Sequence, residues 1–69
     1  MATEEKFFWL YKDDKGEWRW RLYAGNNKII ADSGEGYVDK AKAVYGAKLV
    51  ASVATAAGVY NSIDKKWEQ

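Results

Sequence analysis

The stretch KFFWLYKDDKGEWRWRLYA, residues 6–24, decides the fold of this chain. Its first part is rich in aromatic residues, and in its second part aromatic or aliphatic residues alternate with arginine. Aromatic composition and a period of two are both typical of β-strands. A polar cluster that ends in Gly16 separates the two parts, so the stretch predicts two antiparallel strands joined by a tight turn.

The turn decides which side chains share a face of this hairpin, because a shift of one residue exchanges the two faces. If the loop is residues 14–16, with Gly16 in the left-handed conformation of a glycine bulge, Leu10 lies opposite Trp20. One face then carries only aromatic and aliphatic residues: Phe8, Leu10, Trp18, Trp20 and Leu22. The other face combines aromatic rings with both arginines: Trp9, Tyr11, Arg19, Arg21 and Tyr23.

A loop with an even number of residues gives a different hairpin. It places three aromatic residues of the first strand beside Trp18 and Trp20: Phe7, Trp9 and Tyr11. We favour the first register, since it gives Gly16 the conformation that glycine adopts easily and gives the arginines aromatic neighbours.

The rest of the chain predicts a third strand, a helix and a short fourth strand. Residues 28–32 (KIIAD) complete an antiparallel meander. Residues 38–54 are rich in Ala, Lys and Val and contain no Pro, which favours a helix. Residues 58–62 (GVYNS) predict the fourth strand. We therefore expect one domain over residues 6–62, with residues 1–5 disordered.

Residues 63–69 form a charged tail after this domain. Ile63 and Trp67 are four positions apart, which allows one amphipathic helical turn. Trp67 either packs back onto the domain, which we favour, or anchors a partner.

Two apolar stripes run along the predicted helix. The first consists of small residues: Ala43, Gly46, Ala47, Val50 and Ala54. Small side chains suit close packing on the large aromatic residues of the sheet. The second stripe consists of Ala41, Val44, Tyr45, Leu49 and Val53. Together they are wider than a helix with one covered face needs, so the second stripe either contacts another subunit or covers the sheet edge.

Composition excludes several classes of function. The chain contains no His and no Cys, which excludes zinc fingers, disulfide frameworks, thiol nucleophiles and Ser-His triads. No apolar stretch reaches the roughly 18 residues of a membrane span, and no charged start leads into an apolar signal core. We therefore expect a soluble, cytoplasmic protein with no metal, no cofactor and no membrane contact.

The size of the chain favours association. A chain of about 60 residues buries only about 60% of the surface that its unfolded form exposes. Four Trp, five Tyr and two Phe supply much apolar area, but disulfides and His/Cys metal sites cannot add stability to this chain. Assembly with another chain is the remaining supplement for a small domain, and on this ground we expect a homodimer.

Several motifs occur in a recognisable order along the chain: Leu10-Tyr11-Lys12-Asp13, Gly16, residues 18–22 (WRWRL), residues 29–33 (IIADS) and Glu35-Gly36-Tyr37. This order, over about residues 6–61, resembles the YegP-like family of small uncharacterised domains. The resemblance implies an α+β fold with the order β-β-β-α-β, in which one helix packs on the three-stranded meander. It also implies that two subunits exchange their short C-terminal strands. The family has no agreed activity, so the resemblance implies no reaction.

We expect a non-catalytic interaction or structural module that acts as a homodimer. The candidate face for a partner is the one that carries Trp9, Tyr11, Arg19, Arg21 and Tyr23. It suits another protein or, as the alternative, a single-stranded nucleic acid whose bases stack on aromatic rings. The net charge of +1 makes the nucleic acid the weaker of the two, since such domains are usually clearly basic. The candidate dimer interface consists of Gly58, Val59, Tyr60, Asn61, Leu49 and Val53.

Catalysis is not expected. Asp32, Glu35 and Asp39 come nearest to a carboxylate cluster, but a general acid or base also needs a shifted pKa, and no His is available. Residues 32–36 (DSGEG) carry two glycines before the helix, but their spacing fits no phosphate-binding motif. We interpret them as a connection between strand and helix.

Overall fold

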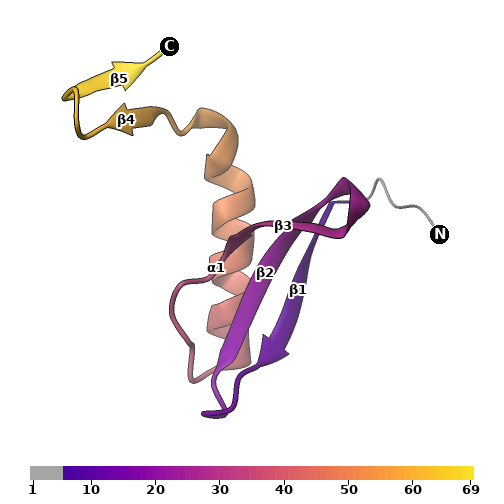
Figure 1. Ribbon diagram of the computed structural model, residues 1–69. Helices are drawn as coiled ribbons and strands as arrows, with labels where there is room; N and C mark the ends of the chain where they lie inside the picture. The colour runs from indigo at the N-terminus through magenta and orange to yellow at the C-terminus, as the bar shows by residue number, and fades with distance from the viewer. Residues whose placement is uncertain (1–5) are drawn as a thin grey trace.

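The computed structural model describes residues 6–69 and shows an α+β fold with a three-stranded antiparallel sheet, one helix and a separate C-terminal hairpin (Figure 1). The elements in chain order are β1 (Phe7–Lys12), β2 (Trp18–Ala24), the 3-10 turn η1 (Gly25–Asn27), β3 (Lys28–Asp32), α1 (Lys40–Val53), the 3-10 turn η2 (Ala54–Ala56), β4 (Val59–Asn61) and β5 (Lys66–Glu68). The sheet order is β1-β2-β3, which confirms the meander. The prediction for residues 1–5 lies outside the described residues.

The register of the first hairpin is the one that the turn residues favoured. Leu10 lies opposite Trp20, and Lys12 lies opposite Trp18. Gly16 has a φ of +81°, in the left-handed region that glycine reaches without strain, and its N–H donates to the carbonyl of Asp13 at 3.0 Å. The two predicted faces of the hairpin are therefore confirmed.

The core is the contact between Trp20 and the small residues of α1. Trp20, Ala43 and Ala47 are buried, and partly buried residues pack around them: Phe8, Leu10, Trp18, Tyr37 and Val50. The predicted packing of small helix residues on large sheet residues is confirmed at this contact. Ala54 departs from it, because it begins η2 and is exposed.

The second apolar stripe of the helix faces solvent in the single chain. Its members other than the partly covered Val44 are exposed: Ala41, Tyr45, Leu49 and Val53. It therefore does not serve mainly to cover the sheet edge. Neither α1 nor any other helix within residues 6–69 is long and apolar enough to cross a membrane.

The helix begins at Lys40, two residues later than its predicted start at residue 38. Tyr37 pairs with Trp18 through two backbone hydrogen bonds of 2.8 Å, which hold the chain against the sheet just before the helix. Asp39 is still extended, with φ −102° and ψ 134°. Strand-like pairing thus delays the helix, although the sequence composition permits an earlier start.

The C-terminal residues form a hairpin that stands apart from the sheet. β4 pairs antiparallel with β5, and Tyr60 lies opposite Trp67 with the ring centroids 5.1 Å apart. Trp67 also lies against Gly58, so it packs within the hairpin. In Figure 1 this hairpin extends from the C-terminal end of α1, away from the three-stranded sheet.

The prediction of an amphipathic helical turn around Ile63 and Trp67 is therefore wrong. The Oδ1 atom of Asn61 accepts the N–H groups of Ile63 and Asp64, both at 3.0 Å, and this arrangement builds a turn. Lys65 then takes a φ of +58°, which reverses the chain into β5. The side chain of Asn61, rather than the spacing of apolar residues, decides the local structure.

The close approach at Gly46 gives a first prediction. A Cβ at this position would lie 2.6 Å from the Oη atom of Tyr37 and 3.2 Å from its Cζ atom. Alanine should gain about 1 kcal/mol in helix propensity, but overpacking costs ~1–3 kcal/mol. We expect Gly46→Ala to lower the free energy of unfolding by about 1 kcal/mol in urea denaturation at fixed protein concentration.

The matched control is Gly46→Ala in a Tyr37→Phe background, where the clashing oxygen is absent. There the alanine should cost less than in the wild-type background, so the two substitutions should be coupled. A Gly46→Ala protein more stable than the wild type would contradict this account of the contact.

Candidate functional site

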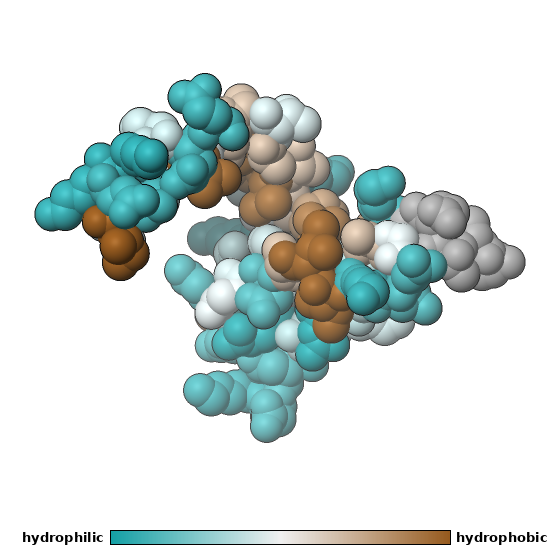
Figure 2. Space-filling model, turned by 45° about the horizontal axis from the view of Figure 1, so that its top comes forward, coloured by the Kyte–Doolittle hydropathy of each residue, from teal (hydrophilic) through white to brown (hydrophobic). Residues whose placement is uncertain are grey.

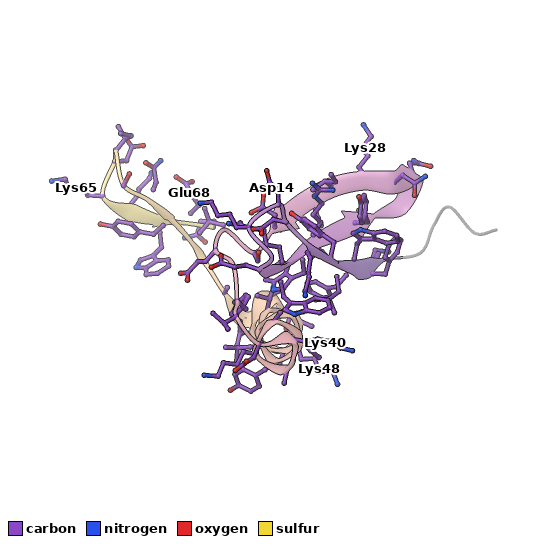
Figure 3. All side chains as sticks on the ribbon, turned by 90° about the horizontal axis from the view of Figure 1, so that it is seen from below. Asp14, Lys28, Lys40, Lys48, Lys65 and Glu68 are labelled. Carbon is purple, nitrogen blue, oxygen red and sulfur yellow. The ribbon has the colours of Figure 1, made fainter. Side chains whose placement is uncertain are left out.

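The candidate partner face forms one continuous surface of the sheet. We use the name outer sheet face for Phe7, Trp9, Tyr11, Arg19, Arg21, Tyr23 and Ile29. Trp9 lies opposite Arg21, Tyr11 opposite Arg19, and Tyr23 lies between Phe7 and Ile29. The helix covers the other face, and in the view along α1 Lys28 points away from the helix on the uncovered side (Figure 3). All five predicted residues are thus brought together.

The first arginine of this face is already neutralised. Arg19 donates from Nε to the Oδ2 atom of Asp13 at 2.6 Å. The Oδ1 atom of the same carboxylate accepts the N–H groups of Lys15 at 3.0 Å and Glu17 at 2.9 Å. Asp13 therefore closes the β1–β2 turn and holds Arg19 at the same time.

This network shifts the ionisation of both partners. The hydrogen bond from Arg19 lowers the pKa of Asp13 below its usual range, and the N–H of Glu17 adds to the effect. The hydrogen bond to Asp13 raises the pKa of Arg19. A lowered carboxyl pKa suits an ion pair, whereas a general acid at neutral pH needs a raised one.

The second arginine is held by an aromatic ring. The guanidinium carbon of Arg21 lies 4.6 Å from the ring centroid of Tyr11, the distance of a cation–π contact. Within residues 6–69, Arg21 forms no ion pair with a carboxylate. Its cross-strand neighbour Asp32 instead accepts the N–H of Gly34 at 2.9 Å, which ties that carboxylate to the turn after β3.

The end of the outer sheet face near the start of β1 is apolar and hollow. A shallow cavity of about 410 Å³ is lined by Phe7, Trp9, Tyr23, Asn27 and Ile29. The rings of Phe7 and Tyr23, two of the lining residues, stack with their centroids 5.1 Å apart. Trp9 is 53% exposed and Ile29 52%, so large apolar side chains meet water here.

A second hollow lies on the helix side of the sheet. This inner groove, of about 210 Å³, is lined by Phe8, Leu10, Trp20, Val44, Ala47 and Lys48. The predicted dimer-interface residues are elsewhere. Leu49 and Val53 lie on the exposed side of α1, and Gly58, Val59, Tyr60 and Asn61 lie in or next to β4. All of these except the partly covered Asn61 are exposed.

The connection over residues 32–36 is a built turn. Ser33 donates from its hydroxyl to the carbonyl of Glu35 at 2.9 Å, and Gly34 has a φ of +74°. A Cβ on Gly36 would clash with the side chain of Glu17, so the chain passes close to the first hairpin here. Asp32, Glu35 and Asp39 form no group of possible metal ligands within residues 6–69.

Sequence reasoning missed four members of this site: Phe7, Asp13, Asn27 and Ile29. A signal existed for two of them. Phe7 and Asp13 share odd numbering with Trp9 and Tyr11, and alternation along a strand places such residues on one face. Asn27 and Ile29 reach the site through η1 and a register shift of β3 between Leu22 and Tyr23, which no alternation predicts.

The Asp13 network predicts a specific pH dependence. Because the pKa of Asp13 is lower in the folded than in the unfolded protein, its ionised form stabilises the fold. This stabilisation should be fully present above the ordinary range of Asp and should be lost as pH falls through the folded-state pKa. Urea denaturation across this range should show a smaller acid-induced loss of stability in Asp13→Asn than in the wild type.

The matched control is Asp14→Asn, which removes a neighbouring exposed carboxylate that forms no ion pair within the described residues. This variant should keep the acid dependence of the wild type. Equal acid dependence in Asp13→Asn and the wild type would refute the role of the network.

Comparison with known proteins shows the family of this chain. Residues 13–61 match the family model described as a domain of unknown function, DUF1508. Two UPF0339 proteins of Neisseria meningitidis, from serogroups B and A, are each 47% identical over 53 residues, which cover 77% of this chain and 93% of each relative. The NMR solution structure of a protein from Haloferax volcanii matches with a TM-score of 0.77 and 40% identity, covering 84% of this chain and 97% of that one. The chain therefore belongs to the DUF1508 family, the YegP-like or UPF0339 family that its motifs resemble.

Proposed function

We propose that this chain is a non-catalytic interaction module that acts as a homodimer and contacts a partner protein through its outer sheet face. In this dimer the segment around β4 crosses to the other subunit. The observation that carries the proposal is the position of the C-terminal hairpin, which leaves apolar side chains exposed while an apolar groove beside β1 stays open.

The exposed side chains of the hairpin and of the helix end support the proposal. Val59 is 65% exposed and Tyr60 is 50% exposed, and they continue the exposed stripe of Leu49 and Val53. Figure 2 shows hydrophobic patches in brown on the hairpin and over the middle of the molecule.

The sheet offers an acceptor for the crossing segment. β1 is an edge strand, so one side of its backbone has no strand partner within the described sheet. The inner groove lies between this strand and α1. A partner segment that adds beside β1 would use the free backbone groups and cover the groove, which is the physics of strand addition.

The second candidate function is weak binding of single-stranded nucleic acid through the outer sheet face. The aromatic rings would suit base stacking. However, Arg19 is neutralised by Asp13, and the net charge is only +1, so few phosphate contacts are available. The charges therefore favour a protein partner.

The proposal predicts the mass of the protein in solution. Light scattering over a dilution series should give a mass near twice 7.9 kDa. Val59→Asp places a charge at the proposed crossing segment and should give a monomer, because an unpaired charge is costly to bury. Ile63→Asp is the matched control, since Ile63 is 85% exposed in the hairpin turn and the substitution should leave the dimer intact.

Circular dichroism of each variant shows whether the chain still folds. A wild-type monomer at all concentrations would refute the dimer. If Val59→Asp remains dimeric, β4 does not form the dimer interface. The exposed side of α1 would then form it.

A further inference from the structure

The outer sheet face combines an apolar hollow with a single guanidinium that forms no ion pair within residues 6–69. Arg21 lies opposite Trp9, which lines the hollow, and its guanidinium lies over Tyr11, the next residue of this face along β1. Two residues along a strand span about 7 Å, so this is the separation between Trp9 at the hollow and Tyr11 beneath the guanidinium. A ligand on this face therefore meets an apolar site and a cationic site about 7 Å apart.

The guanidinium is held in place for such a ligand. Its contact with the ring of Tyr11, at 4.6 Å, restrains a side chain that would otherwise lose freedom on binding. The nearby carboxylates are engaged elsewhere: Asp13 binds Arg19 at 2.6 Å, and Asp32 accepts the N–H of Gly34 at 2.9 Å. The planar donors of Arg21 suit a carboxylate, which arginine binds with good geometry.

We propose that the outer sheet face binds an extended acidic peptide segment of another protein, in which a large apolar residue and a Glu or Asp lie two positions apart. The apolar side chain enters the hollow beside Trp9, and the carboxylate accepts hydrogen bonds from Arg21. This inference rests on the proposed function, because it names the partner of the same face. In an extended chain, side chains two positions apart point to the same side and match the 7 Å between the two sites.

A nucleic acid fits these observations less well. Polyanion binding draws on several phosphate contacts, each of which adds to the salt dependence of affinity. On this side of the sheet, Arg21 forms no ion pair within residues 6–69, and Lys28 lies at the edge strand β3 (Figure 3). Two such cations are few for a polyanion, whereas Arg21 alone suffices for one carboxylate beside an apolar group.

The test uses three short peptides, each acetylated and amidated at its ends. The first is Gly-Phe-Ser-Glu-Gly, the second replaces Glu by Gln, and the third replaces Phe by Ala. Each is titrated into the 15N-labelled full chain, and affinities are taken from NMR shift changes. The first peptide should bind with millimolar affinity, move the backbone signals of Trp9, Arg21 and Tyr23, and bind about tenfold more tightly than the second and third.

Substitutions in the protein identify the group that reads the carboxylate. Arg21→Gln should lower the affinity for the Glu peptide about tenfold and leave the affinity for the Gln peptide unchanged. Arg21→Lys should retain part of the preference, because it keeps the charge and loses the planar donors. Lys42→Gln is the matched charge control, and it should keep the full preference because it removes an exposed cation on α1, outside the outer sheet face.

Several results would overturn the inference. These are equal affinities for the Glu and Gln peptides, a preference that survives in Arg21→Gln, or no shift on this face up to about 10 mM peptide, ten times the expected dissociation constant. Tighter binding of oligothymidylate than of the Glu peptide, with a steep loss of affinity in salt, would replace the peptide by a nucleic acid. The NMR dispersion of each variant shows that it is folded.

Light scattering on the same samples separates this inference from the dimer. A monomer that discriminates between the Glu and Gln peptides would refute the dimer and support the peptide site. A dimer that binds none of the three peptides would support the dimer and refute the peptide site.

Discussion

The packing of Trp20 on Ala43 and Ala47 is the contact on which the rest of this structure depends. These three are the buried hydrophobic residues among the described part of the chain, so the indole ring is at the centre of the contact between sheet and helix. The indole N–H is buried without a hydrogen-bond partner within residues 6–69. The helix can approach a ring of this size only because its facing residues are small, and Gly46 extends that requirement to the contact with Tyr37.

The helix α1 covers one face of the sheet and leaves the other face uncovered. The outer sheet face keeps large aromatic residues in contact with water, and its charges are organised by the first turn. Asp13 completes that turn and pairs with the Nε atom of Arg19, so one carboxylate both closes the turn and neutralises an arginine of this face. Arg21 remains beside an apolar hollow. The fold thereby produces a face with one cationic and one apolar region.

Much of the sheet could be predicted from particular residues. Gly16 favoured one register of the hairpin, and that register placed all five predicted face residues together. The small residues of the helix predicted the core contact. The network of Asp13 was not predicted, although its odd numbering placed it on the face of Arg19. The contributions of Asn27 and Ile29 could not be predicted, because they depend on η1 and on an irregular register in β3.

The sequence by itself determined the meander, its register, the helix and the two faces of the sheet. These features follow from local rules: alternation, turn residues and the sizes of side chains that recur at helical spacing. Only the tertiary structure decided that the tail returns as β5 beside β4 and that this hairpin stands apart from the sheet. A strand of three residues is too short to carry a periodic signal. β4 and β5 pair with each other because Tyr60 contacts Trp67 and because the side chain of Asn61 builds the turn between them.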